Sequence, residues 1–325
     1  MRLRPGVAID LGTVNTLVSV AGRGLVVEEP SAIAVDRSTN SMVAIGHEAD
    51  ALSGKEPQGI EVIHPLRDGV IADLDAATAM LQAFLRRARL RRGLLRGHSV
   101  VCVPSGATWL ERRSLAAAAA ALRPRCTVQM VDEPVAAAAG AGFDLAAGSG
   151  AFIVDIGGGT TEVAVLAGGH VVRAESLRLG GNAMDAAIGR AVKAELGLVI
   201  GRNAARALKV TLGLGDGIAG EAVGVDAALR TPRVEQVPAW VVARALEQPI
   251  ASIVASVQEL LSGIPPNLAE DVVRGKIRLA GGGALLPGLA SRIESAAGIP
   301  AFVVDDPLRC VIRGAAEILE RNQKA

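Results

Sequence analysis

The chain has 325 residues, and its 34 lysines and arginines nearly balance its 33 aspartates and glutamates, which leaves a net charge of +1. Half of the residues are hydrophobic and 21% are charged, which excludes intrinsic disorder and suffices for two domains with separate cores. The neutral balance and the low aromatic content, four Phe, two Trp and no Tyr, argue against nucleic-acid binding by global attraction or by stacking.

The cysteines and the apolar segments indicate a cytoplasmic protein. Cys102, Cys126 and Cys310 are irregularly spaced, which is typical of buried thiols in a reducing compartment rather than of disulfides or a zinc site. The N-terminal MRLRPGVAIDLG reaches an acid before any apolar segment develops, so we expect no signal peptide. No apolar run approaches the roughly 18 residues of a membrane span.

In chain order, the first half predicts strands followed by alternating helices and strands. Short strands rich in Val and Ile are predicted for GVAIDL, TLVSVAG, GLVVEE, AIAVD and MVAIG. A helix is predicted from Asp73, and one of its faces carries Leu74, Ala77, Met80, Leu81, Phe84 and Leu85. Strand HSVVCVP, helix ATWLERRSLAAAAAAL, strand TVQMVDEP and the Ala-rich VAAAAGAG follow, and the last of these must pack closely against a neighbour.

The second half predicts a similar alternation. It opens with AFIVDIGGGTTEVAVLAGGHVV, two strands around a glycine turn. Helices are predicted for 182–196, 203–212 and 238–262, with Pro249 kinking or splitting the last. Strand KIRLAGGG, helix LPGLASRIESAAG, strand PAFVVDD and helix DPLRCVIRGAAEILE complete the pattern. The alternation predicts an α/β protein with central sheets, and no Pro/Ser-rich linker separates the halves, so we expect them to pack around a shared cleft.

Two segments repeat one template, which is an apolar strand, an Asp, a turn with Gly and Thr, and a second β-branched strand. They are VAIDLGTVNTLVSV (7–20) and FIVDIGGGTTEVAV (152–165). Turn amides can bind phosphate oxygens, whereas the neighbouring carboxylate implies a bridging Mg²⁺, held through water. A single copy would read as an ordinary hairpin with turn glycines. Two copies in matching contexts favour a polyphosphate held from both sides.

Other motifs contribute less. A third glycine cluster, LAGGGALLPG (279–288), follows a strand and opens a helix, and is predicted to approach the adenosine side of a nucleotide. GDGIAG (215–220) matches a dinucleotide-binding pattern, but no clear helix follows it. No P-loop motif and no GxSxG nucleophile elbow occur.

On these motifs the chain resembles the MreB/Mbl family of bacterial actin homologues, from about residue 7 to residue 320. The matching blocks are IDLGTVNTL, EEPSAIAV, IHPLRDGVIADLD, VCVPSGATWLERR, DEPVAAAAGAG, VDIGGGTTEVAV, RLGGNAMDAAI, LAGGGALLPGL and DDPLRCVIRG. The resemblance implies an α/β actin-like ATPase fold, with two ribonuclease-H-like lobes and four subdomains around a nucleotide cleft. Lobe I is expected over 1–142 plus 306–325, with a small subdomain at about 33–65, and lobe II over 143–305, with a small subdomain at about 182–240.

The resemblance also implies a site. Asp10 and Asp155 would organise Mg²⁺ through water, and Glu133 would orient the attacking water; an acid at a helix N-terminus that interacts with the dipole is the alternative for Glu133. These three are the expected catalytic residues. The expected nucleotide-binding residues are Thr13, Val14, Asn15, Gly157, Gly158, Gly159, Thr160, Arg206, Lys209, Gly281, Gly282, Gly283 and Ala284.

The nucleoside end departs from the family. Arg202 and Arg206 stand in GRNAARALKV where the family usually carries acids, and an arginine cannot accept a hydrogen bond from a ribose hydroxyl. Asn182 stands where an Asp is common, and Asp132 replaces a Glu. Phosphate and Mg²⁺ binding are therefore better supported than tight ATP binding or rapid turnover.

Residues 86–96, RRARLRRGLLR, form a basic segment with an apolar tip. The charge run alone favours a solvated helix end. The MreB-like context favours membrane contact, in which Leu94 and Leu95 insert while basic neighbours meet anionic headgroups. The arginines assigned to this membrane loop are Arg91, Arg92 and Arg96.

We therefore expect an actin-like cytoskeletal protein that binds ATP or GTP with Mg²⁺ and forms head-to-tail filaments at the inner face of the plasma membrane. Slow ATP hydrolysis would act as a conformational timer, and cell-wall synthesis and membrane-anchored morphogenesis proteins would be the partners. The main alternative is a nucleotide-binding scaffold without hydrolysis, which Arg202 and Arg206 favour. A sugar or small-acid kinase is less expected, because no polar cluster suited to its substrate is found, and a chaperone ATPase is less expected, because it would need an appended substrate domain.

Overall fold

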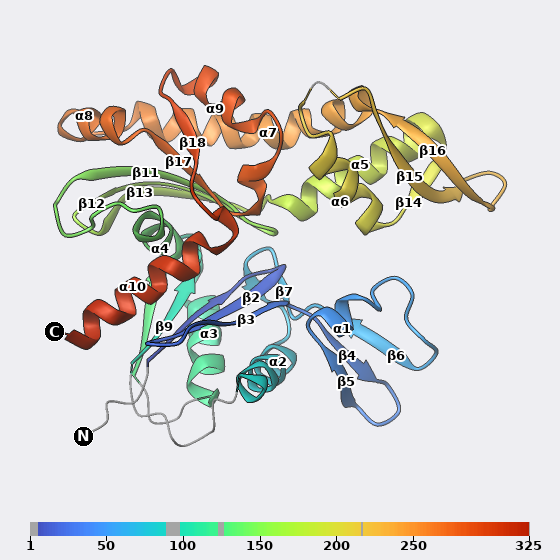
Figure 1. Ribbon diagram of the computed structural model, residues 1–325, viewed down its shortest axis with the longest axis horizontal. Coiled ribbons are helices and arrows are strands. Elements are labelled where there is room, and N and C mark those ends of the chain that lie inside the picture. Colours follow the sequence, from blue (N-terminus) through green and yellow to red (C-terminus); the bar gives the residue numbers. More distant parts are fainter. Residues whose placement is uncertain (1–5, 89–97, 123–126, 216, 325) are drawn as a thin grey trace.

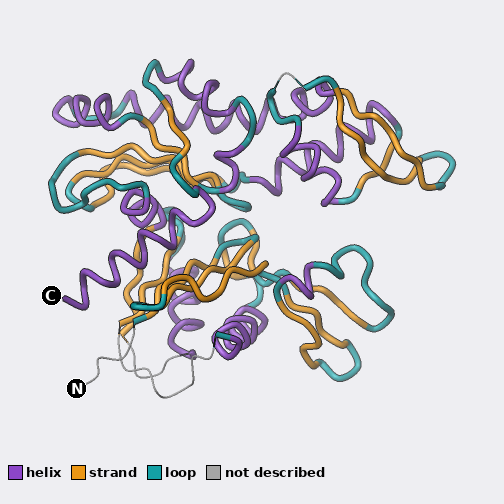
Figure 2. Tube along the Cα trace, viewed as in Figure 1, coloured by secondary structure: helices purple, strands orange, loops and turns teal. Residues whose placement is uncertain are grey.

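The computed structural model describes residues 6–88, 98–122, 127–215 and 217–324. It has two lobes, each built on a five-stranded sheet, and a smaller unit lies beside each lobe (Figure 1, Figure 2). The sheet of the first lobe has the order β10-β9-β1-β2-β3, and that of the second has the order β13-β12-β11-β17-β18. Sheets with helices on them confirm the predicted α/β class.

The first lobe contains strands and helices from the first 140 residues together with the C-terminal helix. Its elements are β1 (Val7–Leu11), β2 (Asn15–Val20), β3 (Gly24–Pro30), β7 (Leu66–Arg67), β8 (Val70–Ile71), α2 (Leu74–Arg87), β9 (His98–Val103), α3 (Trp109–Leu122), β10 (Thr127–Asp132), α4 (Glu133–Gly140) and α10 (Cys310–Lys324). The small unit beside it consists of β4 (Ile33–Asp36), β5 (Ser41–Ile45), α1 (His47–Asp50) and β6 (Ile60–Ile63).

The second lobe follows in sequence. Its elements are β11 (Gly150–Ile156), β12 (Thr161–Ala167), β13 (His170–Leu177), α7 (Ala239–Ser262), α8 (Pro266–Gly275), β17 (Ile277–Ala280), the 3₁₀ turn η1 (Gly282–Leu285), α9 (Leu289–Ala297), β18 (Ala301–Val303) and the 3₁₀ turn η2 (Pro307–Arg309). The small unit beside it consists of α5 (Gly181–Leu196), β14 (Leu198–Ile200), α6 (Arg202–Thr211), β15 (Ala219–Asp226) and β16 (Pro232–Pro238). The predicted limits of the lobes and small subdomains stay a prediction.

The two five-stranded sheets have the same topology, which explains the sequence repeat. In the first, β1 pairs antiparallel with β2 and parallel with β9, and in the second, β11 pairs antiparallel with β12 and parallel with β17. The outer strands repeat the pattern, because β3 and β13 are antiparallel to their neighbours whereas β10 and β18 are parallel. Each copy of the repeated template is therefore the central hairpin of one sheet.

Helices α4 and α10 lie between the two sheets (Figure 1). One apolar cluster joins them to both lobes: Ala8 and Val100 belong to the first sheet, Ile153 and Ala164 belong to the second, and Ala137 belongs to α4. The opposite faces of the sheets are covered by α2 and α3 in the first lobe and by α7, α8 and α9 in the second. The lobes thus share a thin apolar layer made largely of small side chains.

Several predicted elements are confirmed and others are corrected. The side chain of Asp73 caps α2 by accepting the N–H of Ala76 at 2.9 Å, which fixes the predicted helix start. Leu74 is 40% exposed, so it does not belong to the buried face predicted for this helix. Pro249 is buried within α7, which runs unbroken from Ala239 to Ser262 and is not split. α7 packs against α5 and α9, and this packing offsets the hydrogen bond that proline cannot make.

The sequence patterns missed the three strands of the second small unit and helix α8. β14 has only three residues, and β15 contains Gly220 and Gly224, which have no side chain to pack, so neither shows a strong strand signal. The predicted helix after the third glycine cluster begins only at Leu289, because residues Gly282–Leu285 form a 3₁₀ turn.

The Ala-rich segment VAAAAGAG forms most of α4, and this helix crosses α10 at glycine contacts. A Cβ atom on Gly140 would overlap the carbonyl oxygen of Cys310, and one on Gly314 would overlap the carbonyl oxygen of Ala136. Because backbone rather than side-chain atoms block these positions, the two helices cannot move aside cheaply.

We predict that Gly314→Ala lowers the free energy of unfolding by about 1–3 kcal/mol, the usual cost of overpacking a core. Urea unfolding followed by circular dichroism measures it. Gly189→Ala in α5 is the matched control, because a Cβ there meets no atom within 4 Å and the change should stabilise by about 0.5–1 kcal/mol. Equal stability of Gly314→Ala and the unsubstituted protein would contradict the crossing described here.

Candidate functional site

Two glycine turns, one from each lobe, face each other at the boundary between the lobes. The first joins β1 to β2, which begins at Asn15, and the second joins β11 to β12. A Cβ atom on Gly158 would overlap the side chain of Val14, and a Cβ atom on Gly159 would lie 2.5 Å from Oγ1 of Thr13. Only glycine permits this approach, so the structure brings together the two turns that the sequence repeat singled out.

Two hydrogen-bond acceptors of the first turn, the carbonyl oxygen of Gly12 and Oγ1 of Thr13, accept hydrogen bonds from other protein groups. The hydroxyl of Ser31 donates to the carbonyl oxygen of Gly12 at 2.7 Å, and the N–H of Gly69 donates to Oγ1 of Thr13 at 2.9 Å. In the described part of the chain, the backbone N–H groups of Thr13 and Val14 have no protein acceptor. The turn therefore presents donors, which is what an anion requires.

The second turn is held in the same manner by the first residues of α5. The N–H groups of Gly181 and Asn182 donate to the carbonyl oxygens of Gly157 and Gly158 at 3.0 and 2.8 Å, and the N–H of Gly157 donates to the carbonyl oxygen of Thr160 at 2.8 Å. At the tip of the turn, the N–H groups of Gly158 and of the next residue find no acceptor among the described residues. Asn182 thus acts here through its backbone.

Three predicted acids come together beside these turns. Asp10 lies on β1, Asp155 lies on β11, and Glu133 is the first residue of α4. Burial raises the pKa of Asp10 to about 7, and burial with the charges of Asp10 and Glu162 raises the pKa of Asp155 to about 7. Burial is the largest cause that raises the pKa of Glu133 well above its usual range, and repulsion from Asp10, Glu162 and Asp155 adds to it. The lobes therefore enclose a cluster of carboxylates that repel one another.

The donor set fits Mg²⁺ bound together with a phosphate chain. Over the described ranges, no group of three or more His, Cys, Asp or Glu side chains is arranged to hold a metal by itself. Mg²⁺ keeps several waters and commonly binds through one or two carboxylates plus substrate phosphates, so Asp10 and Asp155 beside amide-rich turns are a suitable set.

The third glycine loop packs against the end of β11. Gly281 has φ 77°, and a Cβ atom there would overlap the carbonyl oxygen of Ile156 and lie 2.5 Å from Oδ1 of Asp155. A Cβ atom on Gly283 would overlap the side chain of Ile156. These glycines are thus required by the protein's own packing. The remaining residues of the cluster are Gly282 and the buried Ala284.

Lys209 supports the beginning of α5. Its Nζ atom lies 2.7 Å from Oδ1 of Asp185 and donates to the carbonyl oxygen of Gly181 at 2.9 Å. Burial raises the pKa of Asp185, which the hydrogen bond and charge of Lys209 and the charge of Arg206 partly oppose. Because the N–H of Gly181 in turn holds the second glycine turn, Lys209 is a scaffold residue of the site. Arg206 is exposed on α6, and its contact with a nucleotide stays a prediction.

Arg202 connects the two small units. Its Nη2 atom lies 2.8 Å from Oδ1 of Asp50 in α1, although the two residues are 152 positions apart. The side chains are 45% and 32% exposed, so the ion pair contributes little stability by itself and weakens with salt. The arginine that departs from the family pattern thus pairs with an acid across the lobe boundary.

Glu162 is not among the residues predicted from the sequence; it is buried and lies opposite Asp155 in the β11–β12 ladder. A signal was present, because a four-residue turn at 157–160 places residue 162 directly across from residue 155. Ser105 and Arg112 were not predicted either: Ser105 contacts Glu162 across the lobe boundary, 57 positions away, and Arg112 contacts Asp132 within the first lobe.

The membrane-loop residues Leu94, Leu95, Arg91, Arg92 and Arg96 lie outside the described residues. None of the helices in the described ranges combines the length and apolar character needed to span a bilayer.

Comparisons with known proteins identify the family. The family described as "MreB/Mbl protein" matches residues 4–325. The cell shape-determining protein MreB of Escherichia coli K12 is 40% identical over 322 residues, covering 96% of this chain and 92% of the relative. The cell shape-determining protein Mbl of Bacillus subtilis 168 is 33% identical over 322 residues, covering 98% and 96%.

Solved structures agree in fold. MreB 5 of Spiroplasma citri bound to AMPPNP has a TM-score of 0.93 and 33% identity, with 100% of this chain and 98% of that chain covered. A structure described as the MamK double helical filament has a TM-score of 0.82 at 23% identity, with 98% and 99% covered, and shares the fold. The expected actin-like fold is confirmed, and the chain belongs to the MreB/Mbl family.

Proposed function

We propose that this chain is an actin-like cytoskeletal protein that binds ATP–Mg²⁺ between its lobes and assembles head to tail into filaments. These filaments lie at the inner face of the plasma membrane and direct cell-wall synthesis and cell shape together with membrane-anchored morphogenesis proteins. The observation that carries the proposal is the pair of facing turns with unpaired N–H groups beside three clustered carboxylates. The relatives named as cell shape-determining proteins and the AMPPNP- and ADP-bound MreB 5 structures support it.

In this proposal the two turns bind the terminal phosphates from opposite sides. The N–H groups of Thr13 and Val14 donate from the first lobe, and those of Gly158 and Gly159 donate from the second. Asp10 and Asp155 would hold Mg²⁺ through water, and the ion would supply positive charge that offsets the charge of the phosphates. The same contacts span the lobe boundary, so a terminal phosphate favours the closed arrangement of the lobes.

Glu133 accepts a hydrogen bond from the attacking water and takes up its proton as the water oxygen bonds to the terminal phosphorus, while the bond from that phosphorus to the bridging oxygen breaks and ADP leaves with the electron pair. A base is most effective when its pKa approaches the ambient pH, and the raised pKa of Glu133 has that direction. Loss of the terminal phosphate removes the ligand that joins the turns, which relaxes the lobes and the filament contacts. Hydrolysis therefore acts as a slow conformational timer.

A nucleotide-binding scaffold without hydrolysis is the second candidate. Arg202 and Arg206 favour it, because the first pairs with Asp50 across the lobe boundary and the second offers no acceptor to a ribose. Both candidates bind nucleotide, and only the first releases phosphate.

We predict that ATP with Mg²⁺ brings the protein into the pellet on high-speed centrifugation, with slow release of phosphate. Glu133→Ala should lower phosphate release about 100-fold, the usual contribution of a general base, while the nucleotide dissociation constant and pelleting persist. A monomer that phosphorylates a sugar would favour the kinase reading, and pelleting without phosphate release would favour the scaffold.

Asp155→Asn tests the carboxylate cluster. The folded pKa of Asp155 is about 7 against an ordinary 3.8, so the folded state loses stability as the pH rises from about 4 to 7, and the full loss persists above 7. We predict that the nucleotide-free variant is more stable than the unsubstituted protein at pH 8, by on the order of 2 kcal/mol, and that the gain is smaller at pH 5.

Urea unfolding at both pH values measures this difference. With ATP–Mg²⁺ present the order should reverse, because the unsubstituted protein gains binding energy that the variant lacks. An equal gain for both proteins on adding ATP–Mg²⁺ would remove Asp155 from the proposed metal site.

The membrane part of the proposal depends on the sequence of residues 86–96. We predict that the protein co-sediments with anionic liposomes and that the double substitution Leu94→Ser and Leu95→Ser weakens this binding. The leucines should be needed because each arginine near the membrane surface contributes only about 1 kcal/mol to binding. Leu229→Ser, which changes a leucine that is 74% exposed in the second small unit, is the control and should bind as before. Unchanged liposome binding of the double variant would remove the membrane-loop assignment.

A further inference from the structure

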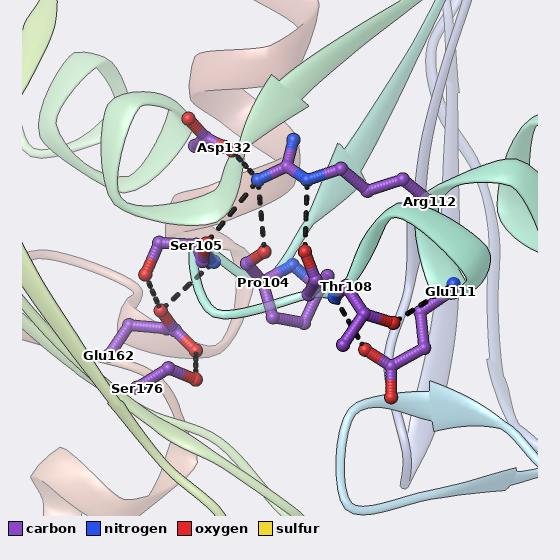
Figure 3. Close-up of polar contacts among 9 residues, drawn as sticks. Pro104, Ser105, Thr108, Glu111, Arg112, Asp132, Glu162 and Ser176 are labelled. Carbon is purple, nitrogen blue, oxygen red and sulfur yellow. Dashed lines mark hydrogen bonds and ion pairs between the residues drawn. The ribbon is translucent and has the colours of Figure 1, made fainter.

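A buried carboxylate connects the two lobes beside the proposed site. Glu162 on β12 is 1% exposed and lies in the second lobe. It accepts the N–H of Ser105 at 3.1 Å and the hydroxyl of Ser105, which belongs to the loop after β9 in the first lobe (Figure 3). Its other oxygen accepts the hydroxyl of Ser176 on β13 at 2.5 Å. Three donors thus compensate a carboxylate that water hardly reaches.

The loop that carries Ser105 is packed tightly onto the second lobe. A Cβ atom on Gly106 would lie 2.6 Å from Cβ of Ser176, so backbone of the first lobe lies directly on β13. Opening the lobes would withdraw both Ser105 donors and leave Glu162 with one. Because an unpaired buried carboxylate is costly, Glu162 ties the position of this loop to lobe closure.

A single guanidinium joins the same loop to the residue before Glu133. Arg112 on α3 donates to Oδ1 of Asp132 at 2.6 Å (Figure 3). It also donates to loop carbonyl oxygens, at 3.3 Å to Ala107, 3.4 Å to Ser105 and 3.5 Å to Pro104. The side chains of Arg112 and Asp132 are each 32% exposed, so water screens this ion pair only in part.

Asp132 is the last residue of β10 and the N-terminal flanking residue of α4, which begins with Glu133. Its side chain does not cap that helix and turns to Arg112 instead. A displacement of the loop therefore acts on Arg112, and Arg112 acts on the backbone that orients Glu133. We call Glu162, Ser105, Arg112 and Asp132 the inter-lobe network.

We propose that Glu162 and Arg112 are positioning residues. Through the inter-lobe network, closure of the lobes orients the Glu133 carboxylate so that it can accept a hydrogen bond from the attacking water. This inference rests on the function proposed above and deepens it. Neither residue need touch the nucleotide. A terminal phosphate favours the closed arrangement of the lobes. Protein contacts, as well as the ligand, thus link this closed arrangement to the active orientation of Glu133.

The test compares single-turnover phosphate release with the nucleotide dissociation constant for Glu162→Gln and Arg112→Lys. The first keeps the side-chain size but removes the charge, and the second keeps the charge but cannot reach several acceptors at once. We expect each to release phosphate at least about tenfold more slowly, because small displacements at a reacting centre are costly, with a dissociation constant within about twofold of the unsubstituted protein. The double variant should lose little more than either single one, since both act through one network.

Two further variants separate positioning from general stability. Asp132→Glu retains a carboxylate for Arg112 and should keep most of the rate, whereas Asp132→Asn should lose rate as Arg112→Lys does. Arg113→Lys is the matched control on the same helix. The guanidinium carbon of Arg113 lies 5.2 Å from the centroid of the Trp109 ring, and Arg113 does not belong to the inter-lobe network. It should release phosphate as the unsubstituted protein does.

Unchanged phosphate release in Glu162→Gln and Arg112→Lys would overturn the inference and leave the proposed function standing. Parallel losses of thermal stability, nucleotide affinity and rate would also overturn it, because they would show a structural role alone. Absence of phosphate release from the unsubstituted protein, despite nucleotide binding, would instead overturn the proposed hydrolysis, and the inference with it.

Discussion

The burial of carboxylates at the lobe boundary is the constraint that most shapes this molecule. Asp10, Asp155, Glu133 and Glu162 come from both lobes. Burial is the main cause that raises the pKa of each, and repulsion from neighbouring carboxylates adds to it for Asp155, Glu133 and Glu162. Such a cluster is costly unless donors or cations compensate it. The structure compensates Glu162 with serine donors, whereas Asp10 and Asp155 lie beside turns rich in N–H groups. The arrangement suits a bound cation with an anionic chain.

The repeated sheet explains why the site is shared between lobes. Each lobe supplies a central hairpin with an acid on its first strand and a glycine turn after it, and the two sheets face each other across α4 and α10. Small residues dominate the layer between the sheets, so contacts there are close but limited in area. Polar contacts at the boundary, such as those of Glu162 and Arg202, therefore contribute directly to how the lobes sit together.

The glycines of the site serve two different purposes. Gly158 and Gly159 permit the turns of the two lobes to approach each other. The carbonyl oxygen of Gly158 accepts the N–H of Asn182 at the start of α5, whereas the N–H groups of both glycines find no acceptor among the described residues. Gly281 and Gly283 instead allow a loop to pack on the end of β11, beside Asp155. A glycine-rich motif can therefore permit the approach of two turns in one place and the packing of a loop on a strand in another.

Local chemistry was sufficient to predict the central hairpins, the start of α2 and the α/β alternation, because periodicity and turn residues act over a few neighbouring residues. The family blocks extended this to the actin-like fold. The weak strands of the second small unit escaped because their pairing, rather than their composition, creates them. The role of the membrane loop stays a prediction, since it lies outside the described residues.

Contacts between the lobes could not be predicted from local sequence patterns. Glu162 meets Ser105 at 57 positions' separation, and Arg202 meets Asp50 at 152. No sequence pattern specifies such pairs, because they depend on how two separately formed sheets are placed against α4 and α10. The amino-acid sequence alone specified which groups carry charge and which turns present hydrogen-bond donors. The packing of the lobes determined which of those groups meet, because a serine or arginine that is distant in the sequence contacts a carboxylate only when both lie at the shared boundary.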